Sequence, residues 1–240
     1  MTTPNPRLWA ILTALAGIAV VAVSLSFALL PEVVAGQAAG CYGKTPPVVA
    51  FEFARTVAEA SVLFGDGDCR ALSLAAMDAI NTADIRVYIP AYTLFAIFGA
   101  VFAARGARPP LVLLAILVAI VAFVADRVET TTLLAATKDL DAAGALLPRS
   151  SAAAWAKFAA LAVHGLLVAG VCLRAPRRWI VCLAMTLPAA GVIAAAIDPA
   201  AYATLMMLGL TVGWLVLLAF ALKESVWLPK RRGTADSRDM

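Results

Sequence analysis

The stretch over residues 111–132 (LVLLAILVAIVAFVADRVETTT) places the strongest limit on what this chain can fold into. Its first 15 residues carry no charge, but a helix needs about 20 residues to cross the apolar core of a bilayer. A helix that starts at Leu111 must therefore continue through Asp126, Arg127 and Glu129 before it leaves the membrane. Charges at that depth are costly when they face lipid, so we expect them to face the protein interior and to pair.

The composition is that of an integral membrane protein. Hydrophobic residues make up 63% of the 240 residues and charged residues 14%, and the mean hydropathy is +0.92. A soluble domain is about 45–50% apolar and about 25% charged. The basic residues behind the net charge of +4 lie mostly in short loops between apolar stretches, which argues against nucleic-acid binding. With a single His, bis-His haem ligation within the chain is impossible, and we expect no metal and no cofactor.

Six apolar stretches follow one another along the chain, and each is long enough to cross a membrane as a helix. We therefore predict an all-α integral membrane protein with one domain over residues 1–226 and a disordered cytoplasmic tail over residues 227–240. A cleaved signal peptide is the alternative for the first stretch, although its apolar region would normally run for only about 7–15 residues. The predicted spans cover residues 8–30, 84–104, 111–132, 151–173, 179–197 and 201–222.

The charges also predict the orientation. Twelve of the 15 acidic residues fall on the outside when the N-terminus is placed in the cytoplasm. This orientation predicts a multi-pass protein of the cell (inner) membrane with both termini cytoplasmic. The basic residues of the cytoplasmic segments are then Arg7, Arg105, Arg108, Arg174, Arg177, Arg178 and those of the C-terminal tail.

Residues 31–83 form a long extracytoplasmic loop, which we expect to be helical in two places. A helix over residues 48–64 would carry Glu52, Arg55 and Glu59 on one side, and a second helix over residues 69–80 would be capped by Asp68. Cys41 and Cys69 both lie in this loop, where a disulfide can persist. Their placement favours a bond, although the spacing alone does not determine its geometry.

The second span opens with a polar helix face. Asp84, Tyr88 and Tyr92 are spaced four residues apart and so lie on the same side of a helix. Pro90 lies between them and removes a backbone donor, so we expect a kink that leaves carbonyls free to take a partner.

The third and fourth spans bring charges to a similar depth. Asp126 and Glu129 share a helix face, whereas Arg127 points about 100° away. Lys157 lies about 9 Å below the outer end of the fourth span and is the natural partner for either acid. Glu52 and Arg55 of the loop helix would close over this cluster. We therefore predict an outward-facing polar pocket whose ligand-binding residues are Glu52, Arg55, Asp84, Tyr88, Tyr92, Asp126, Glu129 and Lys157.

A structural role for the same residues stays open. Tyr88 and Tyr92 suit an interfacial aromatic belt, Lys157 is able to extend toward the membrane surface, and Asp126 with Glu129 suits the solvated end of a tilted helix. His164 lies in the middle of a span and is expected to hydrogen-bond to a neighbouring helix. We expect close helix packing at Gly165, Gly170, Gly191, Gly209 and Gly213.

Several short motifs together resemble a group of uncharacterised bacterial multi-pass membrane proteins. In that group an FE element in the outer loop precedes a D-x3-Y-x-P-x-Y span and a D-x2-E-N span end. The corresponding residues here are Phe51-Glu52, the segment from Asp84 to Tyr92, and Asp126 to Glu129, within roughly residues 48–160. Thr130 stands where that pattern has Asn. The group has no established activity, so the resemblance implies a membrane fold and no particular function.

Three functions remain in view. The first is an uncharacterised membrane protein whose outer pocket binds a lipid headgroup, a small solute or a cation, with membrane lipid as its partner. The second is a non-catalytic accessory subunit that has a membrane protein partner. The third is an enzyme that acts on a lipid or isoprenoid, with a carboxylate as general acid or base. No nucleophile elbow, zinc motif or phosphate-binding loop supports the enzyme.

Overall fold

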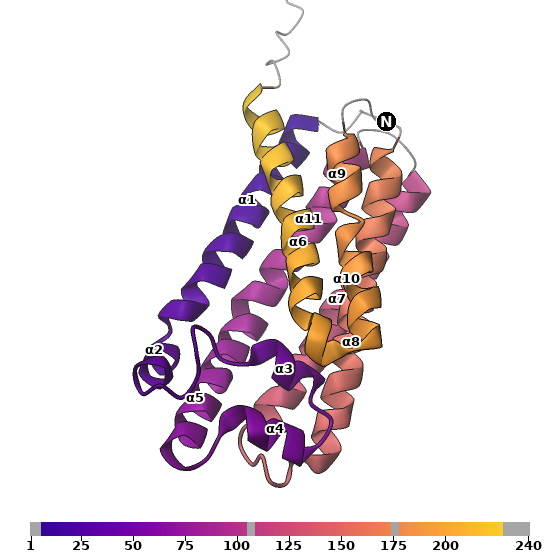
Figure 1. The fold of residues 1–240 in the computed structure, drawn as a ribbon. Coiled ribbons are helices and arrows are strands. Elements are labelled where there is room, and N and C mark those ends of the chain that lie inside the picture. The colour runs from indigo at the N-terminus through magenta and orange to yellow at the C-terminus, as the bar shows by residue number, and fades with distance from the viewer. Residues whose placement is uncertain (1–5, 105–108, 174–177, 228–240) are drawn as a thin grey trace, which may run out of the picture.

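A computed structural model describes residues 6–104, 109–173 and 178–227, and within these residues every regular element is a helix (Figure 1). Six helices are long and apolar enough to cross a membrane. The chain therefore has the all-α, multi-pass architecture that the sequence predicts. Of the tail predicted for residues 227–240, only Trp227 lies within the described residues, and it still belongs to the last helix.

Helices that follow each other along the chain pack together, and the last span also packs against the first, so the spans close into a ring. α6 and α8 touch across this ring and are its most buried members. The spans are α1(Pro6–Ser26) with η1(Phe27–Leu29), α5(Gly67–Ala83) with η2(Asp84–Tyr88) and α6(Ile89–Ala104), α7(Pro109–Ala136), η3(Ala143–Ala145) with α8(Leu146–Cys172), α9(Trp179–Ala184) with α10(Leu187–Ile197), and α11(Pro199–Trp227).

An even number of antiparallel spans brings Pro6 and Trp227, the first and last described residues, to one end of the bundle, which is at the top in Figure 1. We call it the terminal end. The opposite end carries residues 31–66 and 137–145, and we call it the loop end (Figure 1).

The second span begins much earlier than predicted. The loop helix expected over residues 69–80 is the first half of a rod that runs through α5, η2 and α6 without a break. Its N-cap position is Asp66 and not Asp68, because the chain turns at Gly65, with φ of 69°, and at Gly67, the first residue of the helix, with φ of 56°.

Pro90 explains the π-helical turn η2 in the middle of this rod. The amide of Ile89 donates to the carbonyl of Asp84, five residues back. In this pattern residue 90 should donate to the carbonyl of Ile85, but proline has no N–H. Arg127 of α7 supplies the missing donor, with its Nη1 3.0 Å from the Ile85 oxygen. The expected free carbonyl is therefore present and has a partner.

The single helix predicted over residues 48–64 is wrong. The loop contains α2(Pro31–Ala38), α3(Val48–Phe53) and α4(Val57–Phe64), and the chain breaks between α3 and α4 because Thr56 caps α4. The Thr56 hydroxyl accepts from the Glu59 amide, and the Glu59 carboxylate accepts from the amides of Thr56 and Arg55. Glu52, Arg55 and Glu59 therefore do not share one helix side.

A disulfide joins the loop to the start of the second span. Cys41 and Cys69 are bonded, with 28 residues of separation along the chain, as their position in the loop favours. The bond holds the segment after α2 against the first turn of α5, and α2 itself packs along α5. The loop end is thereby fixed to the bundle.

Close helix contacts occur at four of the five expected glycines. A Cβ on Gly165 would lie 2.5 Å from the Met185 carbonyl oxygen, and one on Gly191 would lie 2.6 Å from the Met206 Cα. Gly209 and Gly213 meet backbone oxygens at 2.7 Å and 3.0 Å. Gly170 is the exception, because its Cβ would have no atom of the described residues within 4 Å.

Two further contacts hold the spans together. His164 is buried, and its Nε2 lies 3.1 Å from the Ala96 carbonyl oxygen of α6, which is the interhelical hydrogen bond that its mid-span position predicts. Arg178 is buried at the terminal end, where it donates to the carbonyl of Ala103 at 2.9 Å and to the Glu224 carboxylate at 3.2 Å. This guanidinium caps α6 and ties it to α11.

Candidate functional site

Lys157 of α8 lies among three carboxylates near the loop end. Its Nζ is 2.9 Å and 2.8 Å from the two Glu129 oxygens, 3.3 Å from Asp126 Oδ1 and 3.3 Å from Glu52 Oε2. Only 7% of the Lys157 side chain is exposed, and the three acidic side chains are between 1% and 12% exposed. We call these four residues the Lys157 cluster. The lysine thus has both partners expected from the neighbouring span and a third from the loop.

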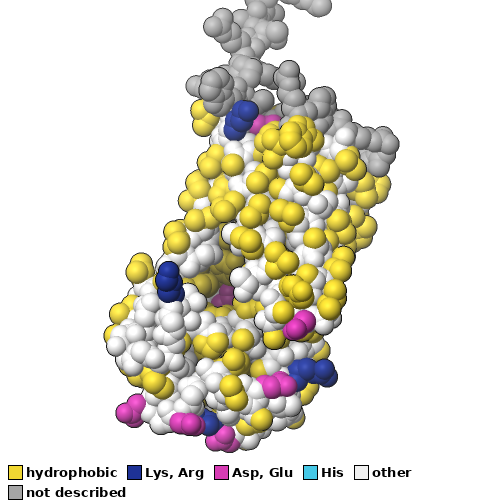
Figure 2. Space-filling view, in the orientation of Figure 1, with side chains coloured by type: hydrophobic (Ala, Val, Ile, Leu, Met, Phe, Trp, Pro, Cys, Tyr) yellow, Lys and Arg dark blue, Asp and Glu magenta, His cyan; other side chains and the backbone are white. Residues whose placement is uncertain are grey.

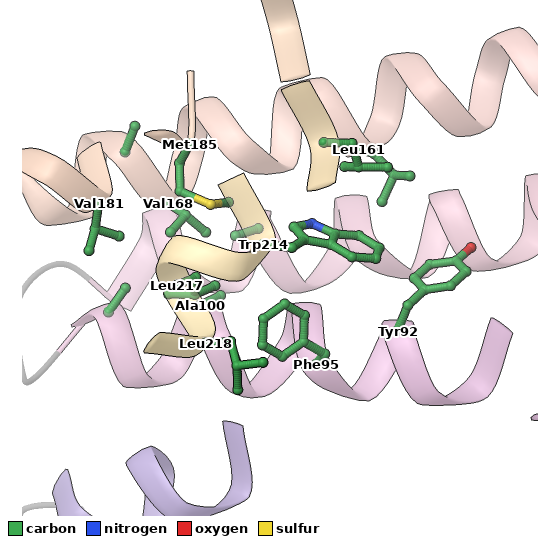
Figure 3. Packing of buried hydrophobic residues seen from close by; sticks show 14 of the residues in the cluster. Tyr92, Phe95, Ala100, Leu161, Val168, Val181, Met185, Trp214, Leu217 and Leu218 are labelled. Carbon is green, nitrogen blue, oxygen red and sulfur yellow. The ribbon is translucent and has the colours of Figure 1, made fainter. Parts of the chain in front are cut away.

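A second layer of side chains orients the acids. The hydroxyl of Tyr92 donates to Asp126 Oδ2 at 2.7 Å, and the hydroxyl of Thr130 donates to Asp84 Oδ2 at 3.3 Å. The Tyr92 ring packs against Trp214, with ring centroids 5.7 Å apart, and its hydroxyl points away from the labelled apolar side chains (Figure 3). Tyr92 therefore belongs both to the apolar core and to the polar cluster.

The Lys157 cluster holds more acid groups than cations. Three carboxylates face one ammonium, which has three hydrogens to donate. Glu52 Oε2, Asp126 Oδ1 and Glu129 Oε2 are buried without a hydrogen-bond partner in the described structure, although each lies within ion-pair distance of the lysine. Burial raises the pKa of the Glu52 carboxyl, which lies outside the spans, against the opposing effect of Lys157. Such a cluster is suited to hold a proton or to accept a further positive charge.

A pocket of about 380 Å³ lies beside this cluster. α3 covers it at the loop end, where Val48, Val49 and Glu52 line it. Most of the lining is apolar, and it comes from the first, second, third, fourth and sixth spans and from the loop. The lining also includes Asp84, Tyr88, Tyr92, Asp126 and Lys157 of the predicted site, together with Phe27, Val33, Ile80, Asn81, Phe158, Leu161, Met207, Leu210 and Trp214.

The mouth of the pocket lies on the side of the bundle, between α1 and α11. Near the middle of α1 the two helices are in close contact, because a Cβ on Gly17 would lie 2.8 Å from Leu218 Cδ1. Seven residues nearer the loop end, about 10 Å along each helix, Ser24 and Thr211 both line the pocket and are exposed. α1 leans away from α11 toward the loop end (Figure 1). Figure 2 shows a hollow on this face with acidic side-chain atoms at its floor.

Seven of the eight predicted site residues lie together at this place. Glu129 belongs to the Lys157 cluster but does not line the pocket, and the other six line it. Arg55 is the exception. It is exposed at the break between α3 and α4, where its backbone amide donates to the Glu59 carboxylate in the cap of α4. The prediction failed for Arg55 because it assumed a continuous helix.

Sequence reasoning missed Asn81 and the aromatic residues that spans one, four and six contribute. Asn81 lies one helical turn before Asp84, so a helix that extended further toward the N-terminus would have placed both on one face. Phe27, Phe158 and Trp214 lie in apolar stretches, where nothing distinguishes a pocket residue from a lipid-facing one.

Comparison of the chain with protein-family models, with curated proteins and with solved structures finds no significant match. In the part of the chain that the structure describes, no group of three or more His, Cys, Asp or Glu side chains is arranged to hold a metal ion.

Proposed function

We propose that this multi-pass membrane protein binds a small amphipathic molecule that enters the pocket from the side. The ligand's polar head lies at the Lys157 cluster and at Asp84, and its apolar part lies among Phe27, Leu210 and Trp214. The observation that carries this proposal is the pocket itself, because it combines an acidic floor, apolar walls and a mouth between two spans. A ligand from water has no need of apolar walls or of a mouth at membrane depth.

The dimensions support a binding role. Ligand pockets commonly have volumes of about 300–1,000 Å³ and present a few polar groups within an apolar lining. The pocket here, at about 380 Å³, is large enough for a headgroup and the first part of a chain. The rest of a longer chain would pass between Ser24 and Thr211 into the surrounding lipid.

We also propose that the loop end faces the outside of a bacterial inner membrane. Arg7, Arg178 and Lys223 lie at the terminal end, as the positive-inside rule expects for a cytoplasmic face. The Cys41–Cys69 disulfide at the loop end suits an oxidising compartment. Under this orientation the pocket lies in the outer leaflet.

Native mass spectrometry of the gently extracted protein tests the binding proposal. The expected spectrum of the natural chain contains the protein with one retained small molecule. Ser24→Trp fills the mouth and should abolish retention, whereas the matched control Ser26→Trp, which is exposed on the same helix outside the pocket, should keep it. Equal retention in both variants, or no retained molecule at all, would contradict the proposal. A co-purifying protein without a ligand would favour the accessory-subunit function instead.

A further inference from the structure

We infer that the head of this ligand carries a positive charge, as an amine or a quaternary ammonium group. The inference rests on the proposed binding function and specifies the chemical class of the ligand. Three independent features of the pocket lead to it, namely its charge, its aromatic lining and one buried amide.

The charge of the pocket favours a cation. Among the described residues, Glu52, Asp84 and Asp126 line it together with one cation, Lys157. The ammonium of Lys157 already has carboxylate oxygens at 2.8–3.3 Å. These carboxylates offset its positive charge, so it offers little attraction to an anionic ligand. The Asp84 carboxyl lines the pocket and accepts from Thr130, a neutral donor, so an ammonium head would give it an oppositely charged partner. An anionic head would meet these acids, and Lys157, the one cation in the described lining, is already paired with carboxylates.

The aromatic lining points to the same class. Phe27, Tyr88, Tyr92 and Trp214 form a row in which neighbouring ring centroids are 5.6 Å, 5.6 Å and 5.7 Å apart, and all four rings line the pocket. Aromatic rings attract organic cations through their electron-rich faces, and quaternary ammonium groups are commonly bound by such rings together with acids. An inorganic cation would instead need a shell of oxygen ligands.

Asn81 adds a second recognition group. Its side chain is 3% exposed, it lines the pocket, and its Nδ2 has no hydrogen-bond partner in the described structure. It lies one helical turn from Asp84, so a ligand oxygen near the charged nitrogen would accept from it. Amino alcohols and their esters carry both a nitrogen and an oxygen in the head.

Binding of three radiolabelled probes to the full chain in lipid nanodiscs tests the inference. The probes are hexadecyltrimethylammonium, hexadecanol and palmitate, which share a chain length and differ in the charge of the head. We expect the ammonium probe to bind at least about tenfold more tightly than the other two. Asp84→Asn should reduce that preference by about tenfold, because a charged partner is lost, and leave hexadecanol binding unchanged. Asp78→Asn is the control, since Asp78 is an exposed acid on the same helix outside the pocket.

The outcomes separate the inference from the function on which it rests. If hexadecanol or palmitate binds as tightly as the ammonium probe, or if Asp84→Asn and Asp78→Asn behave alike, the positive head is wrong while the pocket stands. If none of the probes binds and the mouth variant Ser24→Trp has no effect on retained molecules, the binding function itself is wrong.

Discussion

An ammonium group buried between membrane helices is stable only with opposite charges beside it. Lys157 of α8 meets this condition with three carboxylates. Glu129 and Asp126 lie one turn apart on α7, and Glu52 comes from the loop. Residue spacing predicted the first two partners, because Asp126 and Glu129 lie on one face of α7. The contribution of Glu52 depends on how the loop folds back over the bundle.

Replacing Lys157 by methionine should strongly destabilise the protein. Glu52, Asp126 and Glu129 would then lie together without a cation, and loss of one partner of a buried ion pair costs about 3–5 kcal/mol. Denaturant unfolding in detergent measures the change. Adding Glu129→Gln to Lys157→Met should recover part of the stability, and Lys44→Met, at an exposed loop position, should have little effect. A Lys157→Met protein as stable as the natural chain would show that the cluster is not held by charge.

Glu52 should make stability depend on pH. Burial raises the pKa of its carboxyl in the folded protein, so the protonated form is the one that folding favours. This contribution is complete below the unfolded pKa of about 4.3 and is lost as the pH rises through the raised folded value. The melting temperature of the natural chain should therefore fall relative to that of Glu52→Gln as the pH increases from about 4. Parallel pH profiles for the two proteins would contradict this role of Glu52.

At the scale of the helices, two interruptions, the π-helical turn η2 and the break at residues 185–186, form specific contacts with neighbouring helices. η2 exists because Pro90 has no amide hydrogen. Arg127 of α7 donates to the Ile85 carbonyl in place of the missing backbone amide. The break at residues 185–186 separates α9 from α10, and α10 begins with a proline in its first turn. At this break the Met185 carbonyl approaches Gly165 of α8, where any larger residue would collide.

Two glycines on α8 provide a matched test of that contact. Gly165→Ala should lower stability by about 1–3 kcal/mol, because its Cβ would lie 2.5 Å from a backbone oxygen that has little room to move. Gly170→Ala adds the same atom five residues later, where no described residue lies within 4 Å of it. This change should be neutral or slightly stabilising because alanine favours the helix. Thermal unfolding of the two variants side by side gives the answer. Equal effects would mean that α8 and the 185–186 break are not in close contact.

At the scale of the whole molecule, the sequence predicted six helices long enough to cross a membrane and the meeting of Lys157 with Asp126 and Glu129, because apolar length and residue spacing follow directly from the chain. It did not predict that α1 and α11 separate near the loop end. Ser24, Phe27 and Trp214 line the pocket only because the last span returns to pack beside the first. Residues so far apart in the chain carry no common pattern, and the predicted pocket therefore lacked its apolar wall and its side opening.

The proposed orientation predicts which end of the bundle reacts from outside the cell. In a chain with Cys172 and Cys182 replaced by serine, a cysteine at position 141, in the exposed loop at the loop end, should react with a membrane-impermeant maleimide in intact cells. A cysteine at position 223, near the terminal end of α11, should react only after the membrane is permeabilised. The reverse pattern would place the pocket in the inner leaflet.

The most direct test of a side-entry pocket is photocrosslinking in vesicles, followed by mapping of the labelled residues by mass spectrometry. The probe is a long-chain quaternary amine that carries a diazirine near its head. We expect labels concentrated at the mouth and wall of the pocket, on Ser24, Phe27, Met207 and Thr211, and we expect them to be lost in Ser24→Trp. Labels spread evenly over the lipid-facing side of α7, at Leu113, Leu117 and Ile120, without enrichment between α1 and α11, would contradict it.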